Sequence, residues 1–192
     1  MKNEKLSCAL LAFAVCPVFA ADLPDFDYIE LAYSQLSLDR NDNTPSGLVL
    51  RGSYTVLPYL YVTGSYARLS ESLNGYDLKY NNLSSGFGSK FSVSENWAVY
   101  TEITYENEDG LGNGYHHADG YGVAAGVRGS FYRNLQTDIK YKYEDWGPAY
   151  IESAGGVEFT AQYYFDIGMA VGIGYEINDE YNAGSLSIRY SF

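Results

Sequence analysis

The last nine residues, GSLSIRYSF (Gly184–Phe192), alternate between apolar and polar side chains without interruption. Successive side chains of an extended strand point to opposite faces, so one face of this segment carries Leu186, Ile188, Tyr190 and Phe192. The other face carries three serines and one arginine. The segment therefore predicts a strand with an apolar environment on one side and water or polar partners on the other.

The same alternation runs along the chain and predicts an all-β protein. In LQTDIKYKYED (residues 135–145), apolar residues occupy the odd positions as far as Tyr143, whereas Lys140, Lys142 and Glu144 occupy even ones. A helix would bring these charges round to its apolar side. We predict ten strands, at residues 28–37, 47–57, 60–70, 77–93, 97–107, 120–131, 135–145, 155–165, 168–178 and 183–192.

The connections between these strands alternate in length. Four are tight turns, and the links between them are polar and mostly longer. This alternation of short turns and longer links predicts a single domain, residues 21–192. The domain is expected to fold as an up-and-down antiparallel barrel with both termini at the short-turn end. The turns lie at 57–59, 94–96, 132–134 and 166–167, and the links at 38–46, 71–76, 108–119, 146–154 and 179–182.

The N-terminus has the pattern of a secretory signal peptide. Lys2 and Lys5 precede an almost wholly apolar run, residues 6–15, and Val18 and Ala20 supply small residues for cleavage after Ala20. The run is too short to cross about 30 Å of hydrocarbon as a helix. We therefore expect residues 1–20 to be removed after export.

Removal of this segment changes the chemistry available to the chain. Both cysteines, Cys8 and Cys16, would be lost, so we expect no disulfide and no cysteine-based site. Loss of Lys2, Glu4 and Lys5 would take the net charge from −12 to −13. A chain this acidic is poorly suited to bind nucleic acid.

Charges and aromatic rings indicate which face of the barrel is outside. The apolar face is uncharged except at Arg68 and Lys79, near the long-link end. A lipid-facing Arg or Lys costs roughly 2–4 kcal/mol at the bilayer midplane, which would enforce such exclusion. Aromatic residues gather at both ends of the strands, as two membrane interfaces would select. We therefore predict a transmembrane barrel with its apolar face toward lipid; a soluble ligand-binding barrel ranks below it.

The C-terminal pattern is an aromatic last residue with apolar residues two, four and six positions before it. It resembles the signal that the assembly machinery of Gram-negative outer membranes recognises. The whole chain resembles the small outer-membrane β-barrel superfamily that includes the OmpA transmembrane domain, OmpX and opacity proteins. Residues 50–54, LRGSY, and residues 119–131, DGYGVAAGVRGSF, are similar to a porin-like subfamily. Many superfamily members have eight strands, so eight is the alternative to ten.

This resemblance implies a location and a set of partners. We expect the outer membrane, contact with its lipid and lipopolysaccharide, and delivery by periplasmic chaperones to the assembly machinery. We expect no cofactor. An external surface or a host molecule is the remaining class of partner.

Charged residues on the polar face are the main candidate site, because they point into the lumen. Opposite charges there can pair and offset the cost of leaving water. They would form either a structural plug or the gate of a small pore, and Glu30 and Arg189 are expected to pair because their strands close the barrel. The candidates are Glu30, Arg51, Lys90, Glu102, Arg128, Asp138, Lys140, Lys142, Glu158, Glu176 and Arg189.

The only two histidines, His116 and His117, lie in the longest link beside acidic residues. Adjacent histidines on a glycine-rich loop rarely converge on one ion, so they are weak metal candidates and no metal is expected. Neither lies in a predicted strand beside a serine, so no activated nucleophile and no enzyme activity are expected. Tyr115, His116 and Tyr150 are the candidates for contact with an external ligand.

The expected function is structural or interactive. A rigid barrel would stabilise the envelope and display its longer links, where binding residues usually lie. The alternative is a small porin-like channel for passive diffusion of ions or small solutes. The two differ in whether the inward charges close the lumen.

Overall fold

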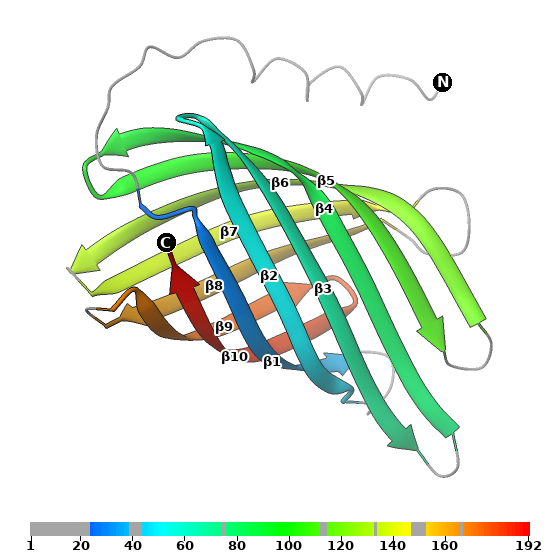
Figure 1. The fold of residues 1–192 in the computed structure, drawn as a ribbon. Coiled ribbons are helices and arrows are strands. Elements are labelled where there is room, and N and C mark those ends of the chain that lie inside the picture. Colours follow the sequence, from blue (N-terminus) through cyan, green and yellow to red (C-terminus); the bar gives the residue numbers. More distant parts are fainter. Residues whose placement is uncertain are drawn as a thin grey trace, which may run out of the picture.

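The computed structural model describes residues 24–38, 44–73, 76–111, 115–132, 134–146, 153–165 and 167–192, so the predicted signal peptide lies outside the described residues. Ten antiparallel strands form one closed barrel (Figure 1). They are β1 (Tyr28–Leu38), β2 (Ser46–Leu57), β3 (Leu60–Leu73), β4 (Tyr76–Ser94), β5 (Trp97–Leu111), β6 (Tyr115–Tyr132), β7 (Leu135–Asp145), β8 (Ala154–Tyr164), β9 (Met169–Asn178) and β10 (Tyr181–Ser191).

Each strand pairs with its neighbour in sequence, and β10 closes the barrel on β1. The closing pair keeps one register throughout, from Tyr28 opposite Ser191 to Leu38 opposite Tyr181. The predicted up-and-down topology and the count of ten strands are confirmed, and the eight-strand alternative is wrong. In the described part of the chain, no helix is long and apolar enough to cross a membrane.

The start of β1, the C-terminus and the short turns lie at the same end of the barrel (Figure 1). The C-terminus is bonded to the residue before β1 there, because Phe192 N donates to Asp27 O over 3.2 Å. The predicted placement of both ends of the domain at the short-turn end is therefore confirmed.

Two of the predicted links were too long. Residues 71–73 pair with residues 76–78, and β5 and β6 remain paired as far as Leu111 opposite Tyr115. The polar composition of 71–76 and 108–119 suggested loops, but backbone hydrogen bonds can continue a hairpin beyond the apolar band without apolar side chains. Within 38–46 and 146–154, residues 39–43 and 147–152 lie outside the described residues.

Burial alternates along the strands with the apolar face outward. In β1, Leu31 and Tyr33 are 50% and 53% exposed, whereas Glu30 and Ala32 are 1% exposed. A soluble barrel would bury the large apolar side chains instead. The polarity is therefore that of a transmembrane barrel, and the terminal residues Leu186, Ile188, Tyr190 and Phe192 all face outward.

Aromatic residues mark both edges of the apolar band. At the short-turn end, Trp97 packs edge-on against Phe131 with ring centroids 5.1 Å apart. Toward the other end, Tyr105, Tyr121 and Tyr175 are exposed on the outer wall. Rings at these two levels match the two interfaces of a bilayer.

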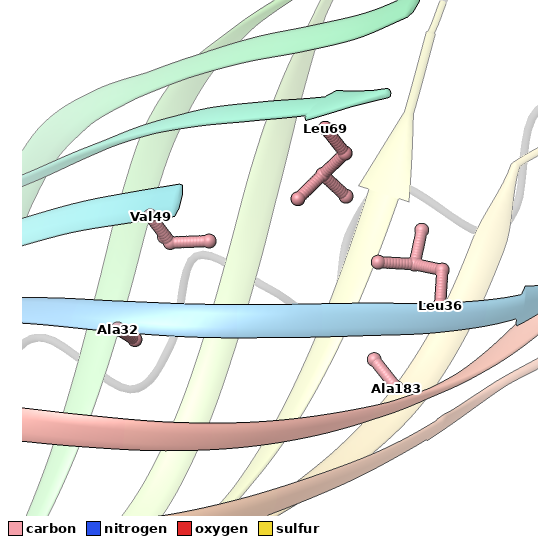
Figure 2. Close-up of a cluster of buried hydrophobic side chains, with 5 residues drawn as sticks. All are labelled: Ala32, Leu36, Val49, Leu69 and Ala183. Atoms are coloured by element: carbon pink, nitrogen blue, oxygen red, sulfur yellow. The ribbon is translucent and has the colours of Figure 1, made fainter. Parts of the chain in front are cut away.

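Part of the lumen wall is apolar, which the alternation pattern did not predict. Ala32, Leu36, Val49, Leu69 and Ala183 form a buried cluster inside the barrel (Figure 2). Tyr80 and Tyr181 pack against it. These inward residues come from β1, β2, β3 and β10, with Tyr80 on β4, so one side of the lumen is apolar toward the long-hairpin end.

Candidate functional site

Glu30 is the centre of the ion pairs at the barrel seam. Arg51 and Arg189 lie directly opposite it on the strands to either side, β2 and β10. Its carboxylate accepts from Arg189 Nη2 at 2.8 Å, Arg51 Nη1 at 3.3 Å and Gln162 Nε2 at 2.8 Å. The predicted pairing of Glu30 with Arg189 is confirmed, and two further donors complete the site.

A second set of charges crosses the lumen. Arg51 Nη1 on β2 lies 3.1 Å from Glu158 Oε1 on β8, and Lys140 Nζ on β7 lies 2.8 Å from Glu158 Oε2. Strands β2 and β8 are separated around the barrel wall by β1, β10 and β9. The bridge Arg51–Glu158–Lys140 therefore spans the interior, and we call it the septum.

The septum divides the space inside the barrel. A cavity of about 90 Å³ lies toward the short-turn end and one of about 130 Å³ toward the long hairpins, and all three septum residues line both. Ligand pockets usually measure about 300–1,000 Å³. Each cavity has room for a few water molecules, and the septum side chains form part of the boundary of both.

Lys142 makes a further contact across β6. Its Nζ lies 3.1 Å from Glu106 Oε1 and 2.5 Å from Glu144 Oε1. Gly122 of β6 permits this approach, because a Cβ there would lie 2.9 Å from Glu106 Oε1 and 3.3 Å from Lys142 Cε. Glu106 lies within the predicted strand 97–107 but was not among the predicted lumen residues, and it is fully buried in the lumen wall.

Glu106 leaves one oxygen without a donor. Its Oε1 accepts from Ser84 Oγ at 2.9 Å, Thr104 Oγ1 at 2.6 Å and Lys142, but Oε2 has no hydrogen-bond partner in the described part of the chain. A buried carboxylate oxygen of this kind is costly unless water or an ion reaches it. Its even position, shared with Glu102 in the predicted strand 97–107, was the available signal that it faces the lumen.

A third cluster lies nearer the short-turn end. Arg128 Nε lies 2.6 Å from Asp138 Oδ2, and Tyr100 OH donates to Asp138 Oδ1 over 2.6 Å. All three side chains are nearly buried. This pair stays local to adjacent strands β6 and β7, so it braces the wall and does not cross the lumen.

The segment before β1 plugs this end. Phe26 is 2% exposed and contacts Tyr61 and Tyr100 with ring centroids at 5.0 and 5.6 Å. The guanidinium of Arg128 lies 4.2 Å from the ring centroid of Phe26, and Lys90 Nζ lies 4.9 Å from it. Two aromatic residues on the polar face, Tyr61 and Tyr100, were the available signal for this plug.

The remaining predicted lumen residues bond to hydroxyl groups. Lys90 Nζ donates to Thr55 Oγ1 over 2.6 Å, Tyr61 OH donates to Glu102 over 2.9 Å and Tyr181 OH donates to Glu176 over 2.9 Å. The ion pairs among the predicted lumen residues fall into three groups, because Arg51 joins the seam to the septum, Lys142 pairs with Glu106 and Glu144, and Arg128 pairs with Asp138. Glu176 lies directly opposite Glu158 yet outside the septum.

Of the two histidines considered as metal ligands, the structure describes the side chain of His117 alone. His117 Nδ1 lies 2.8 Å from Asp109 Oδ1, and its Nε2 lies 3.4 Å from Asp119 Oδ2. The hydrogen bond with Asp109 and the nearby carboxylates raise the pKa of this exposed imidazole above its ordinary value. No group of three or more His, Cys, Asp or Glu among the described residues is arranged to hold a metal ion.

The expected contact residues lie outside the described part. Tyr150 and the side chains of Tyr115 and His116 are not described.

Comparison with solved structures finds the same fold in outer-membrane porins and channels. The KdgM porin in complex with disordered oligogalacturonate matches at a TM-score of 0.53 and 10% identity, over 86% of this chain and 99% of that one. The NanC porin matches at 0.56 and 9%, over 85% and 100%. An outer membrane channel of Pseudomonas putida F1 matches at 0.57 and 13%, over 93% and 100%. No protein-family model and no curated protein matches the sequence.

Proposed function

We propose that this protein is a closed outer-membrane scaffold of a Gram-negative cell that displays its long hairpins outside. The observation that carries the proposal is the septum, in which Arg51 bridges the lumen to Glu158. A pore for diffusion needs a continuous aqueous path, and this bridge lies across it. The barrel then acts through its outer wall and its external hairpins.

In this proposal, the N-terminal segment directs export of the scaffold and its C-terminal strand directs assembly into the outer membrane. Residues 1–20 direct export and are removed, which leaves residues 21–192 as the mature domain. Periplasmic chaperones hold the chain, and the assembly machinery binds the outward row that ends at Phe192. Lipid and lipopolysaccharide surround the barrel, and no cofactor or catalysis is involved.

The displayed surface is formed by the hairpins β3–β4 and β5–β6. Both remain paired past the tyrosine level, to Leu73 opposite Tyr76 and to Leu111 opposite Tyr115. Hydrogen-bonded hairpins hold their side chains in fixed positions, which suits recognition of an external surface or host molecule. Tyr115, His116 and Tyr150 remain the proposed contact residues.

A small channel is the second candidate, and two observations favour it. The lumen contains two polar cavities, and the septum residues line both. The chain also shares its fold with the KdgM and NanC porins. In this alternative the septum residues form a gate that opens for ions or small solutes.

Location and orientation can be tested with single cysteines, because the mature domain contains none. We choose Gly110→Cys on the β5–β6 hairpin, where an added Cβ meets nothing within 4 Å, and Glu95→Cys in an exposed short turn. A membrane-impermeant maleimide should label the first in intact cells and the second only after the outer membrane is permeabilised. The reverse pattern, or labelling of neither after permeabilisation, would refute the proposal.

A further inference from the structure

Two positively charged side chains, Arg68 and Lys79, lie on the outer wall, which is otherwise free of Arg and Lys among the described side chains. Among the described side chains, Arg68 on β3 and Lys79 on β4 are the only Arg or Lys residues on the outward face, and both are exposed. Arg68 lies directly opposite Asn81, two residues from Lys79 on the same strand. Arg68 and Lys79 are therefore diagonal neighbours, with about 7–8 Å between such positions.

The height of this pair matches the upper edge of the apolar band. Arg68 follows the turn residue Tyr59 by nine positions and the outward Tyr66 by two. Strands tilted by about 40° rise roughly 2.5 Å per residue, so Arg68 lies about 23 Å above Tyr59. The apolar band of such barrels is about 25 Å tall. The guanidinium therefore lies where the lipid headgroups of the outer leaflet begin.

Outward acids whose side chains the structure describes at this rim have partners of their own. Asp119 accepts from Tyr105 OH and from Asn107 Nδ2, and Asp109 contacts His117. In contrast, no ion pair among the described residues involves Arg68 or Lys79. Their charge is thus available to an anion from outside the chain.

We propose that Arg68 and Lys79 bind the phosphate groups of lipid A, the glycolipid anchor of lipopolysaccharide, at the outer leaflet. The Arg68 guanidinium presents a planar fork that fits two phosphate oxygens, and the Lys79 ammonium adds a point charge. Asn81, between them, adds amide donors. The apolar wall below, with Leu83 and Tyr66, contacts the acyl chains. This inference rests on the outer-membrane location and the outward direction of the hairpins proposed above.

The test measures binding of the refolded mature protein to lipid A in detergent micelles by calorimetry. Wild type should prefer bisphosphorylated lipid A over its dephosphorylated form. Arg68→Gln combined with Lys79→Gln should weaken binding of the phosphorylated form about 30-fold, which corresponds to roughly 1 kcal/mol for each charge. Arg68→Lys combined with Lys79→Arg should retain most of the affinity. Asp119→Asn, a charge change at the same rim, should not weaken binding.

Three results would overturn the inference: no preference of wild type for the phosphorylated form, equal affinity in the double Gln variant, or displacement of lipid A by millimolar inorganic phosphate. The last would identify a site for free anions. Folding is checked first by heat-dependent migration in gels. A chain that does not fold into a membrane barrel would refute the proposed function itself, whereas a folded barrel without phosphate preference would refute only the lipid site.

Discussion

Arg51 on β2 and Glu158 on β8 meet across the interior of the barrel, with Nη1 and Oε1 3.1 Å apart. Three strands of the wall lie between them in the shorter direction. Most of the other ion pairs among the described residues join adjacent strands, where register brings them together. This one joins strands that are not neighbours, and its residues line both of the small cavities inside the barrel.

Removal of the shared carboxylate should destabilise the barrel. Glu158→Gln leaves Lys140 without its only ion-pair partner among the described residues and takes one of two from Arg51. Breaking a buried pair costs about 3–5 kcal/mol, and because these side chains keep partial contact with water we expect about 2 kcal/mol. Urea-induced unfolding in phospholipid vesicles measures the loss.

The matched control is Glu176→Gln. Glu176 lies directly opposite Glu158 in the same lumen but bonds to Tyr181 OH and makes no ion pair within the described residues. We expect it to lose less than half as much stability. Equal losses for the two variants would mean that the septum adds nothing to the wall.

Exchanging Glu30 and Arg189 should restore only part of the thermal stability that Arg189→Glu alone removes. Arg189→Glu places two carboxylates together and should impair heat-stable folding and lower the melting temperature. Exchanging Glu30 and Arg189 restores that pair but puts a second cation beside Arg51, because Glu30 contacts both arginines. The melting temperature of the exchanged variant should lie between those of Arg189→Glu and wild type. Complete recovery would argue that the contact with Arg51 contributes nothing.

Phe26→Ala should loosen the short-turn end. The ring packs on Tyr61 and Tyr100 and beneath Arg128, and its loss leaves a cavity. Large-to-small changes at buried Phe cost about 3–5 kcal/mol, so the urea midpoint should fall clearly. Phe26→Leu, which keeps most of the apolar volume, should lose much less. An unchanged midpoint in Phe26→Ala would show that the segment before β1 does not seal the lumen.

The β5–β6 hairpin should respond to pH through His117. The folded pKa is raised by the bond with Asp109 and by the charge of Asp119. The imidazolium therefore stabilises the folded hairpin fully below the unfolded pKa near 6.5, and this contribution is lost as pH rises through the raised folded pKa. An NMR titration of the His116→Gln variant isolates the signal. Asp109→Asn should lower the titration midpoint, and no change would refute the pairing.

The sequence predicted the fold almost completely because alternation is a local property. Strand number, turn positions and the outward row ending at Phe192 all follow from period two and need no knowledge of partners. The pairing of Glu30 with Arg189 was predictable for the same reason, since closure of the barrel places the first and last strands side by side.

The septum could not be predicted in the same way. Whether Arg51 meets Glu158 depends on the stagger of the strands and on side-chain rotamers, which no local pattern contains. Phe26 precedes the first strand, so alternation could not assign it to the lumen. The apolar cluster around Leu36 and Val49 was missed because the polar face was assumed to be polar throughout.

Single-channel recording from the refolded mature protein in a planar bilayer tests the closed lumen most directly. Insertion is established first by heat-dependent migration and by protection from protease. If the septum closes the lumen, the bilayer should show no unitary currents at voltages where an open porin of this size gives them. Reproducible unitary currents from wild type, altered in size by Glu158→Gln or Lys140→Gln, would contradict the closed scaffold and make the septum the gate of a channel.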